Sequence, residues 1–526
     1  MYHINRKVDK PDVGHMEFIV SKLMERGIKL ADCTKLRNYY ANLREELRAE
    51  FQTKYGVSNP NSAQQITWYL ENLSRSINLS SKNDIINICY NDETGKWTSN
   101  ADAMEKLADL GYEFAQDLLD YRHAKKYAES IESVMDAADE NGLVHPTVTL
   151  GKTHRINYSK PGIMTIPKKL LWHMIEPFKQ GNILYSVDIK NQEPNILINM
   201  TNAEELKFAL ESEDGLYETM FKRCFQPTAT ANILVDTLPE NRVYTIPEIK
   251  KLGTISPAMY SAVRPATNNL YVNGKKIIGI ETICAGSEKG VMIELPDTVD
   301  VELEDGSFAK LPVEWESAEK KCKRSNDYSL IGKLSGADVE ISKAERKEFK
   351  QSWLALSYGA SVFGIKQMCK TIDGTRVYNY ITSIEAIKEY RKQIEKYAKQ
   401  GNTGICTIFG TPMSAGVDTD DWKKLRRVLL DLPIQGSGAD ILSLLIKHFF
   451  EYTEEHELAD KMILYYTRHD ELIIEVDGEW VNEVGDEHVC EVLKDMLEHQ
   501  IDDWTPFKVE ISQTHADKLG LDFEED

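Results

Sequence analysis

The sequence predicts an α+β protein, in which a helical first quarter precedes a longer part that mixes strands and helices. Residues 14–58 and 99–137 carry helix-compatible patterns. Strand-like runs begin only after Leu143, and the last part of the chain alternates short apolar strands with a helix. At 526 residues the chain is long enough for a large core and roughly two to four structural units.

The composition is that of an ordinary soluble protein, with 42% hydrophobic and 28% charged residues. No apolar run approaches the roughly 20 residues of a membrane span, and the N-terminus has no apolar signal core. The eight cysteines are scattered without a CxxC pair, which favours reduced thiols and argues against a zinc site. We therefore expect a cytoplasmic protein with no membrane partner.

The net charge of −21, from 63 basic and 84 acidic residues, argues by itself against binding nucleic acid. Net charge does not describe local patches, however, and the acidic residues of a metal enzyme are offset by its cations. The acidity is therefore a caution and does not exclude a nucleic-acid partner.

The elements follow in order along the chain. Residues 14–58 predict a helical hairpin broken at Gly27, and strands are expected at 144–150 and 183–189. Residues 226–335 hold Pro-rich turns and alternating runs, which predict a β-rich insertion whose acidic stretch 297–305 is a solvated hairpin face. Further elements are a helix at 203–225, a helix opened by the Ser342–Glu345 capping box, helices at 384–399, 420–453 and 483–499, and strands at 462–468, 472–476 and 507–512.

Four segments carry candidate chemistry. The first is the strand that ends at Asp188, with Glu193 five residues later on the next helical turn. The alternative interpretation is a helix N-cap aspartate followed by a surface glutamate. The second is the helix after Ser342, where Arg346, Lys350, Leu354 and Tyr358 recur every four residues along one slanted face.

Two cations and an aromatic ring in line suit a nucleoside triphosphate, although a solvated basic face would give the same spacing. The third segment is Leu432–Asp440, in which a proline and two glycines near a helix start would permit close backbone approach, and Gln435 could reach a minor groove. An ordinary helix start is the alternative.

The fourth segment is the acidic pair Asp470-Glu471 between two apolar runs. Burying carboxylates there costs several kcal/mol unless a cation compensates them. A bound divalent metal ion is the natural compensation.

The four segments in this order resemble the family A DNA polymerases. Asp188 matches the first metal-binding aspartate of that family and Glu193 the glutamate that excludes ribose. Arg346, Lys350 and Tyr358-Gly359 match the fingers-helix pattern, Leu432–Asp440 is similar to the Pro-Val-Gln-Gly-Thr-Ala-Ala-Asp segment, and His469-Asp470-Glu471 matches the second metal motif. Asn61-Ser62, Thr153-His-Arg155, Thr165-Ile-Pro167 and Arg427 extend the resemblance over most of the chain.

The resemblance implies a right-hand polymerase fold with a helical thumb, an antiparallel-sheet palm and helical fingers. The expected regions are 1–140 for the N-terminal helices and thumb, 141–225 for the first part of the palm, 226–335 for the insertion, 336–415 for the fingers and 416–526 for the rest of the palm.

It also implies a template-directed DNA polymerase that adds dNTPs to a primer 3′-hydroxyl with two Mg²⁺ ions, for which Mn²⁺ can substitute. The implied metal ligands are Asp188, Asp470 and the backbone carbonyl of Ile189, with Lys350 a further catalytic residue. The implied nucleotide-binding residues are Arg346, Lys350, Leu354, Tyr358, Glu193 and Ile189, and the implied DNA-binding residues are Arg155, Arg427, Gln435, His469 and Glu471. The partners would be primer–template DNA, dNTPs and a separate exonuclease or processivity factor in a bacterial or phage-infected cytoplasm.

Four positions depart from the family pattern: Ile189 replaces the palm tyrosine, Asn195 an arginine, Leu354 an aromatic residue and Phe409-Gly410-Thr-Pro a basic element. Because the helical region begins at about residue 14, we expect no proofreading domain before it. The alternatives are a single-subunit phage-type RNA polymerase, whose fingers helix looks much like residues 350–364 but which has a small residue at the Glu193 position, and a catalytically idle DNA-binding scaffold.

Overall fold

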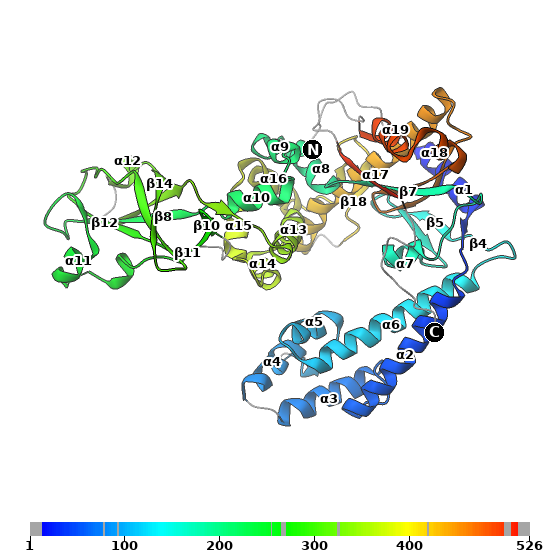
Figure 1. Cartoon of the computed structure of the whole chain (residues 1–526), viewed down its shortest axis with the longest axis horizontal. Helices are drawn as coiled ribbons and strands as arrows, with labels where there is room; N and C mark the ends of the chain where they lie inside the picture. Colours follow the sequence, from blue (N-terminus) through cyan, green and yellow to red (C-terminus); the bar gives the residue numbers. More distant parts are fainter. Residues whose placement is uncertain are drawn as a thin grey trace. The chain divides into compact units, whose positions relative to one another are not determined.

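The computed structural model describes residues 13–76, 79–91, 94–253, 255–264, 270–322, 327–417, 420–498 and 507–513. The ends of the first and last expected regions, residues 1–12 and 514–526, lie outside the described residues. The chain forms two compact units. Unit 1 comprises the described part of residues 191–437, and unit 2 comprises the described parts of residues 13–190 and 438–513 (Figure 1).

The N-terminal part of unit 2 is helical. A long pair of helices, α2 and α6, packs side by side, and the smaller helices α3, α4 and α5 cover one end of the pair (Figure 1). Their shared core includes Phe51, Leu70, Met104 and Leu118, all buried. The helices are α1 Val13–Arg26, α2 Thr34–Tyr55, α3 Ala63–Ser76, α4 Leu79–Cys89, α5 Ala101–Asp109 and α6 Glu113–Asp136, and two short ladders join β1 Ile28–Lys29 to β4 Leu143–Val144 and β2 Tyr90–Asn91 to β3 Lys96–Trp97.

A four-stranded antiparallel sheet forms the rest of unit 2, in the order β19-β20-β7-β21. All six residues of β20 are buried, because this central strand is covered on both faces. The strands are β7 Ile183–Ile189, β19 Met462–Arg468, β20 Glu471–Val476 and β21 Val509–Gln513. Around them lie the hairpin β5 Thr147–Leu150 and β6 Ile156–Ser159, the 3₁₀ helix η1 Ile163–Thr165, and helices α7 Lys168–Trp172, α18 Gly478–Val484 and α19 Asp486–Glu498.

Unit 1 has a helical part and a strand-rich part. Helix α13 begins at the expected capping box, in which Ser342 and Glu345 bond each other's backbone N–H. The helices are α8 Gln192–Thr201, α9 Glu204–Glu211, α10 Leu216–Cys224, α13 Lys343–Ser357, α14 Val362–Met368, α15 Gly374–Ser383 and α16 Glu385–Lys399, with a hairpin of β17 Gly404–Cys406 and β18 Pro412–Ser414. Helix α17 Trp422–Glu455 continues into unit 2.

The strand-rich part is one nine-stranded sheet in the order β16-β10-β11-β13-β14-β15-β8-β12-β9. Its elements run from β8 Thr228–Val235 to β16 Asp338–Val339, slightly beyond the expected end at 335. Between them are β9 Val243–Tyr244, α11 Ile246–Leu252, η2 Pro257–Met259, β10 Leu270–Val272, β11 Lys275–Ile280, β12 Thr282–Ser287, β13 Thr298–Leu303, β14 Phe308–Trp315, α12 Glu319–Cys322 and β15 Tyr328–Leu334.

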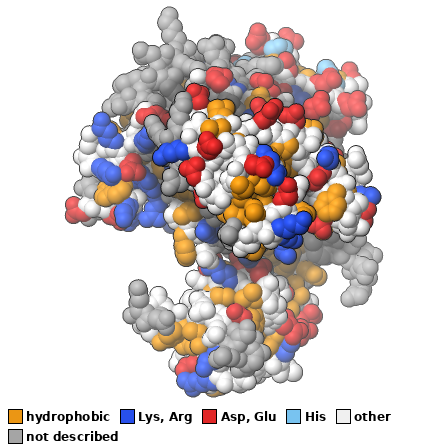
Figure 2. Space-filling model, turned by 90° about the vertical axis from the view of Figure 1, so that its left-hand side faces the viewer, with side chains coloured by type: hydrophobic (Ala, Val, Ile, Leu, Met, Phe, Trp, Pro, Cys, Tyr) orange, Lys and Arg blue, Asp and Glu red, His pale blue; other side chains and the backbone are white. Residues whose placement is uncertain are grey.

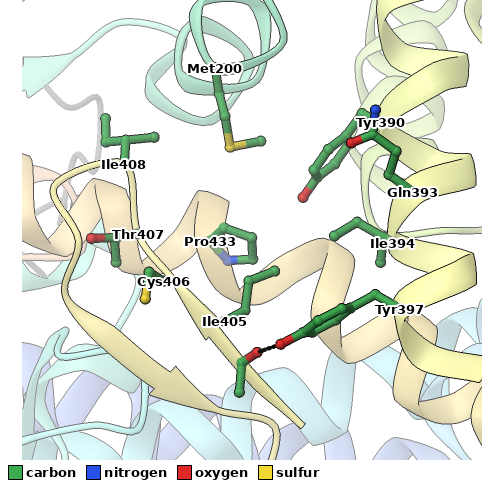
Figure 3. A pocket seen from close by; sticks show the side chains of 11 residues that line it. Met200, Tyr390, Gln393, Ile394, Tyr397, Ile405, Cys406, Thr407, Ile408 and Pro433 are labelled. Atoms are coloured by element: carbon green, nitrogen blue, oxygen red, sulfur yellow. Dashed lines mark hydrogen bonds between the residues drawn. The ribbon is translucent and has the colours of Figure 1, made fainter. Parts of the chain in front are cut away.

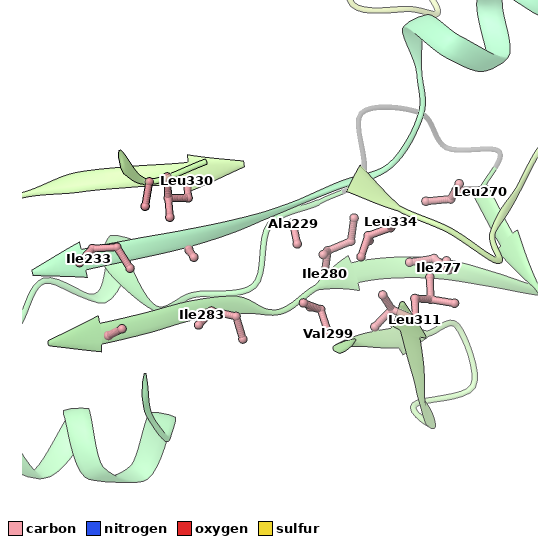
Figure 4. Packing of buried hydrophobic residues seen from close by; sticks show 14 of the residues in the cluster. Ala229, Ile233, Leu270, Ile277, Ile280, Ile283, Val299, Leu311, Leu330 and Leu334 are labelled. Carbon is pink, nitrogen blue, oxygen red and sulfur yellow. The ribbon is translucent and has the colours of Figure 1, made fainter. Parts of the chain in front are cut away.

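This sheet encloses its own apolar core, in which side chains of β8, β11, β13 and β15 gather (Figure 4). In β13 the buried residues Val299, Val301 and Leu303 alternate with outward-facing acidic ones, as the period of a strand requires. The acidic stretch is thus a hairpin surface, and Lys275 pairs with Asp305 at its turn with a separation of 2.7 Å.

The first and last long strands of the insertion are neighbours. Thr228 of β8 pairs with Lys333 of β15, so the first and last long strands are adjacent, whereas the two-residue β16 that follows pairs with β10 at the edge of the sheet. Helices α10 and α13, which flank the insertion in sequence, remain in contact. An inserted domain with adjacent ends does not disturb the elements on either side of it.

Two expected helices are each divided in the structure. Residues 203–225 form α9 and α10, separated at residues 212–215, where Gly215 has a φ of +79°. Residues 483–499 overlap the end of α18 and the whole of α19, separated at Gly485 with a φ of +88°. In both places a glycine with a positive φ lies between the two helices: Gly215 precedes the first residue of α10, and Gly485 follows the last residue of α18.

We expect Ile473→Ala to lower the free energy of unfolding by about 2–5 kcal/mol, because Ile473 is fully buried in the central strand and its removal leaves a cavity. The matched control is Ile331→Ala in β15, where 43% of the side chain is exposed and the change should stay within about 0.5 kcal/mol. Urea titration followed by tryptophan fluorescence measures both. Equal shifts of the two urea midpoints would contradict the central, buried position of β20 in the four-stranded sheet.

Candidate active site

The acidic residues of β7 and of the β19–β20 turn lie at one end of the four-stranded sheet. Asp188 is the direct cross-strand partner of Glu471, and the backbone N–H of Ile189 lies 3.4 Å from the carbonyl oxygen of Asp470. His469 holds the tight turn with a φ of +56°. Strand register thus brings together the three expected metal ligands, Asp188, Ile189 and Asp470, and places Glu471, which was expected to contact DNA, next to them.

The like charges at this end of the sheet perturb one another. Partial burial and the neighbouring carboxylates of Asp470 and Glu471 raise the pKa of Asp188 from 3.8 to about 6. Glu510 of β21 pairs with Asp188 on its other side, so a further carboxylate adjoins the row. A group with this environment is a functional-site candidate on physical grounds.

Two neighbours compensate the buried carboxylate of Glu471. The Ser186 hydroxyl donates a hydrogen bond to it from β7, and the Lys168 ammonium lies 2.6 Å from Glu471 Oε1. The same ammonium lies 4.0 Å from Asp188 Oδ2. Sequence reasoning missed Lys168, Ser186 and Glu510. The sequence signal for Lys168 was its place directly after the Thr165-Ile-Pro167 motif.

The carboxylates at this end of the sheet fit a hard divalent cation whose other ligands come from water or substrate. Within the described ranges, no group of three or more His, Cys, Asp or Glu side chains is placed to hold a metal ion. Mg²⁺ is usually bound through one or two carboxylates together with waters and substrate phosphates. Asp188 and Asp470 are two such carboxylates, on adjoining elements of one sheet end.

The hairpin of β5 and β6 adds positive charge beside the turn. The hydroxyls of Tyr158 and Thr467 lie 3.0 Å apart and join this hairpin to β19. Partial burial, together with Arg468 and Arg155, lowers the pKa of His469 against the opposing effect of Asp470. The structure therefore brings Arg155 and His469, both expected to contact DNA, into electrostatic range of each other.

Helix α13 presents the slanted face expected from its spacing. Arg346 and Lys350 are exposed, whereas Leu354 and Tyr358 are half-buried. The Tyr358 hydroxyl donates a hydrogen bond to Glu193 at the start of α8. Cationic and aromatic groups thus share one face within unit 1.

Tyr217 of α10 completes this face, and nothing in the sequence indicated it. Its ring centroid lies 5.6 Å from Lys350 Nζ, and its side chain is 2% exposed. Burial raises the pKa of Tyr217, and Glu193 raises it further while Arg346 lowers it. Tyr217 therefore lies among the three charged residues expected to select and bind the nucleotide.

The end of α13 packs closely on α17. Gly359 has a φ of +84°, and a Cβ built there would lie 2.9 Å from Leu430 Cδ1 and 3.4 Å from Arg427 Cγ. A side chain at this position is therefore excluded by both space and backbone conformation. This contact places Arg427, an expected DNA-binding residue, beside the C-terminal end of α13.

The Leu432–Asp440 segment lies inside α17 and not near a helix start, so that expectation was wrong. Helix α17 begins at Trp422 and continues through Pro433. Gly436 nevertheless serves the expected close approach, because a Cβ there would lie 2.2 Å from Met413 of the β17–β18 hairpin. Gln435, one residue before it, is half-buried.

Unit 1 also contains an apolar cavity of about 100 Å³ between α16, α17 and the β17–β18 hairpin. Figure 3 shows Tyr390, Ile394, Tyr397 and Ile405 around it, with Pro433 of α17 between them. The Tyr397 hydroxyl donates to the Gly404 carbonyl at its rim. The lining contains none of the residues expected to act on nucleotide, metal or DNA.

Comparison with known families decides the relationship. A model of "DNA polymerase family A" matches residues 31–233 and 332–517, which is most of the chain. The chain belongs to DNA polymerase family A. The matched segments include all thirteen site residues expected from the sequence and leave unmatched most of the nine-stranded sheet.

Curated relatives of this family A member are bacterial enzymes named DNA polymerase I. The protein from Aquifex aeolicus is 27% identical over 48% of this chain and 42% of its own length. The protein from Caldicellulosiruptor bescii is 27% identical over 34% of this chain and 21% of its own length. The aligned part thus spans less than half the length of these relatives.

A solved structure, the POL domain of Pol1 from M. smegmatis in complex with DNA primer-template and dNTP, shares the fold. The TM-score is 0.61 at 15% identity, over 95% of this chain and 69% of the other. The expected α+β polymerase fold is therefore confirmed. A model of "Bacterial Ig-like domain (group 4)" matches residues 280–337, within the nine-stranded sheet.

Helix α17 is the one described helix long and apolar enough to cross a membrane by length and composition. Of its most apolar window, 83% is buried inside the structure. This is the burial of a core helix, and the finding is weak evidence for a membrane span.

Despite the net acidity, acidic and basic side chains are intermixed on the face shown in Figure 2.

We expect Asp188→Asn to stabilise the metal-free protein more at pH 8 than at pH 5. The pKa of Asp188 is raised to about 6 in the folded protein, so its proton stabilises the fold below about pH 4, and that stability is lost as pH rises through 6. Asparagine carries no charge to repel. Thermal unfolding in EDTA at the two pH values measures the difference.

The control variant, Asp305→Asn, should change the stability in the opposite direction. Lys275 and Ser307 lower the pKa of Asp305, so ionised Asp305 is stabilising and Asp305→Asn should destabilise at both pH values. If Asp188→Asn lowered the melting temperature at pH 8, the repulsion among Asp188, Asp470 and Glu471 would be refuted.

Proposed function

We propose that this chain is a template-directed DNA polymerase that transfers nucleotidyl groups from dNTPs to a primer 3′-hydroxyl. The observation that carries the proposal is the meeting of Asp188 and Asp470 at one sheet end, in a chain of DNA polymerase family A. Since the aligned relatives are matched over less than half their length, their activity is proposed here for this chain and not transferred to it. A cytoplasmic location accompanies the proposal.

Asp188 and Asp470, with the carbonyl of Ile189, would hold two Mg²⁺ ions, for which Mn²⁺ can substitute. When bound, such a pair of ions activates the attacking oxygen and stabilises the leaving one. The departing charge needs further compensation, because the transition state of phosphoryl transfer spreads negative charge over several oxygens. Arg346 and Lys350, both exposed on the face of α13, supply two positive charges for the triphosphate. Lys350 can also donate a proton to the pyrophosphate.

The pair of Tyr358 and Glu193 would select the sugar. Tyr358 holds the Glu193 carboxylate by a hydrogen bond, which fixes its position at the start of α8. A ribose 2′-hydroxyl then meets a carboxylate already engaged, whereas a deoxyribose leaves that space free. Leu354, half-buried between Lys350 and Tyr358, would border the same nucleotide.

The primer–template is assigned to residues of both units. In unit 2, Arg155 and His469 beside the acidic turn would contact the primer end, which Glu471 helps to position from its buried place. In unit 1, Arg427 and Gln435 of α17 would read acceptors in the minor groove that all correct base pairs share.

We assign removal of mismatched 3′ ends to a separate exonuclease, and a mismatched primer incubated without dNTPs should keep its length.

We expect Asp188→Asn and Asp470→Asn each to slow primer extension by a factor on the order of 10³ or more, because each removes one charge that would hold the metal ions. Gel analysis of a labelled primer measures extension, and fluorescence anisotropy should show DNA binding largely retained. Asp305→Asn, in the insertion, serves as the control with normal extension. Extension near the normal rate in either active-site variant would refute the metal assignment.

We expect Glu193→Ala to raise ribonucleotide incorporation by roughly ten- to a hundredfold, and Tyr358→Phe to raise it less, because phenylalanine only releases the carboxylate. Parallel extensions with dNTPs and NTPs measure the ratio. Tyr397→Phe removes a tyrosine hydroxyl bonded to the Gly404 carbonyl and is the control. Preference of the unaltered protein for NTPs would favour the phage-type RNA polymerase instead.

A further inference from the structure

The Lys168 ammonium lies next to the carboxylates of Glu471 and Asp188. It lies 2.6 Å from Glu471 Oε1 and 4.0 Å from Asp188 Oδ2, so one cation faces two carboxylates of different strands. The Lys168 side chain is 39% exposed, whereas that of Glu471 is 5% exposed. The ammonium therefore lies at the boundary between the buried carboxylate and solvent.

The backbone that carries Lys168 is firmly held. It is the first residue of α7, directly after Pro167. Leu170, Leu171 and Trp172 of this helix are buried, and the Arg468 guanidinium of β19 donates to the carbonyl of Ile166 with a separation of 2.8 Å. The same strand that leads into the acidic turn thus fixes the start of α7.

The side chain itself is free to withdraw. A lysine carries a compact charge on a flexible four-carbon stem, and its exposed fraction leaves room for the ammonium to turn toward solvent. Glu471, in contrast, is fixed by the Ser186 hydroxyl and by the sheet. A buried ionised carboxylate is costly unless a nearby charge or hydrogen bonds compensate it.

We propose that the ammonium of Lys168 lies beside Glu471 and Asp188 as a resident cation when no divalent ion is bound, and that a divalent ion held by Asp188 and Asp470 binds by displacing it. This inference rests on the proposed function, in which Asp188 and Asp470 hold the metal ions. The consequence is that Lys168 weakens the binding of a divalent ion to the protein without DNA or nucleotide, while it holds the two carboxylates in place.

The test is Mn²⁺ binding to the full chain without DNA or nucleotide, measured by electron paramagnetic resonance of the free ion. Lys168→Gln keeps a hydrogen-bond donor for Glu471 and removes the charge. It should tighten Mn²⁺ binding on the order of tenfold, because the positive charge that lies 4.0 Å from Asp188 Oδ2 no longer competes with the ion for that carboxylate. Lys168→Arg keeps the charge and should bind Mn²⁺ as the unaltered protein does.

Lys169→Gln is the matched control, since it removes the same charge from an exposed side chain one residue along α7, and it should leave Mn²⁺ binding unchanged. Thermal unfolding gives a second readout. Without a divalent ion Lys168→Gln should melt at a lower temperature, and Mn²⁺ should raise its melting temperature more than that of the unaltered protein.

Unchanged or weaker Mn²⁺ binding by Lys168→Gln, with an equal rise in melting temperature, would overturn the inference and leave Lys168 as a structural ion pair. Failure of the proposed function looks different. In that case Asp188→Asn and Asp470→Asn would bind Mn²⁺ as the unaltered protein does, whatever residue stands at position 168.

Discussion

The register between β7 and β20 is the constraint on which the acidic centre depends. It sets Asp188 opposite Glu471 and brings the turn carrying Asp470 beside Ile189. Six consecutive pairings, from Glu471 with Asp188 to Val476 with Ile183, fix this register. The free energy of the packed sheet therefore holds together carboxylates that repel one another, and Lys168 and Ser186 reduce the remaining cost at Glu471.

A second set of contacts organises unit 1. Tyr358 joins the end of α13 to Glu193 at the start of α8, and Gly359 lets α13 approach Leu430 and Arg427 of α17. Glu193 follows Asp188 by five residues along the chain. Buried Tyr217 lies near Lys350 and within electrostatic range of Glu193 and Arg346.

The nine-stranded sheet forms a separate hydrophobic core within unit 1. Its first and last long strands are joined by the pairing of Thr228 with Lys333, and the family A match resumes at residue 332, within β15. The part matched by an Ig-like model contains strands β12 to β15 and no residue of the proposed active site. This arrangement lets an additional domain be carried between α10 and α13 without moving either helix.

The sequence by itself predicted the strands that carry the carboxylates, the capping box of α13, the cationic face of that helix and a helix at 420–453 that is observed as Trp422–Glu455, because these depend on local periodicity and spacing. The family was indicated by the motifs through which the chain resembles it. The sequence misplaced Leu432–Asp440 near a helix start, because Pro433 and two glycines favour one locally, whereas the structure has this segment inside α17 with Gly436 against Met413 of the β17–β18 hairpin. Ser186, Tyr217 and Glu510 could not be found, because each matters through a neighbour distant in sequence, and Lys168 was signalled only by its place after Thr165-Ile-Pro167. Tertiary structure alone decided which charges meet, since electrostatic interaction depends on distances that strand register and helix packing set.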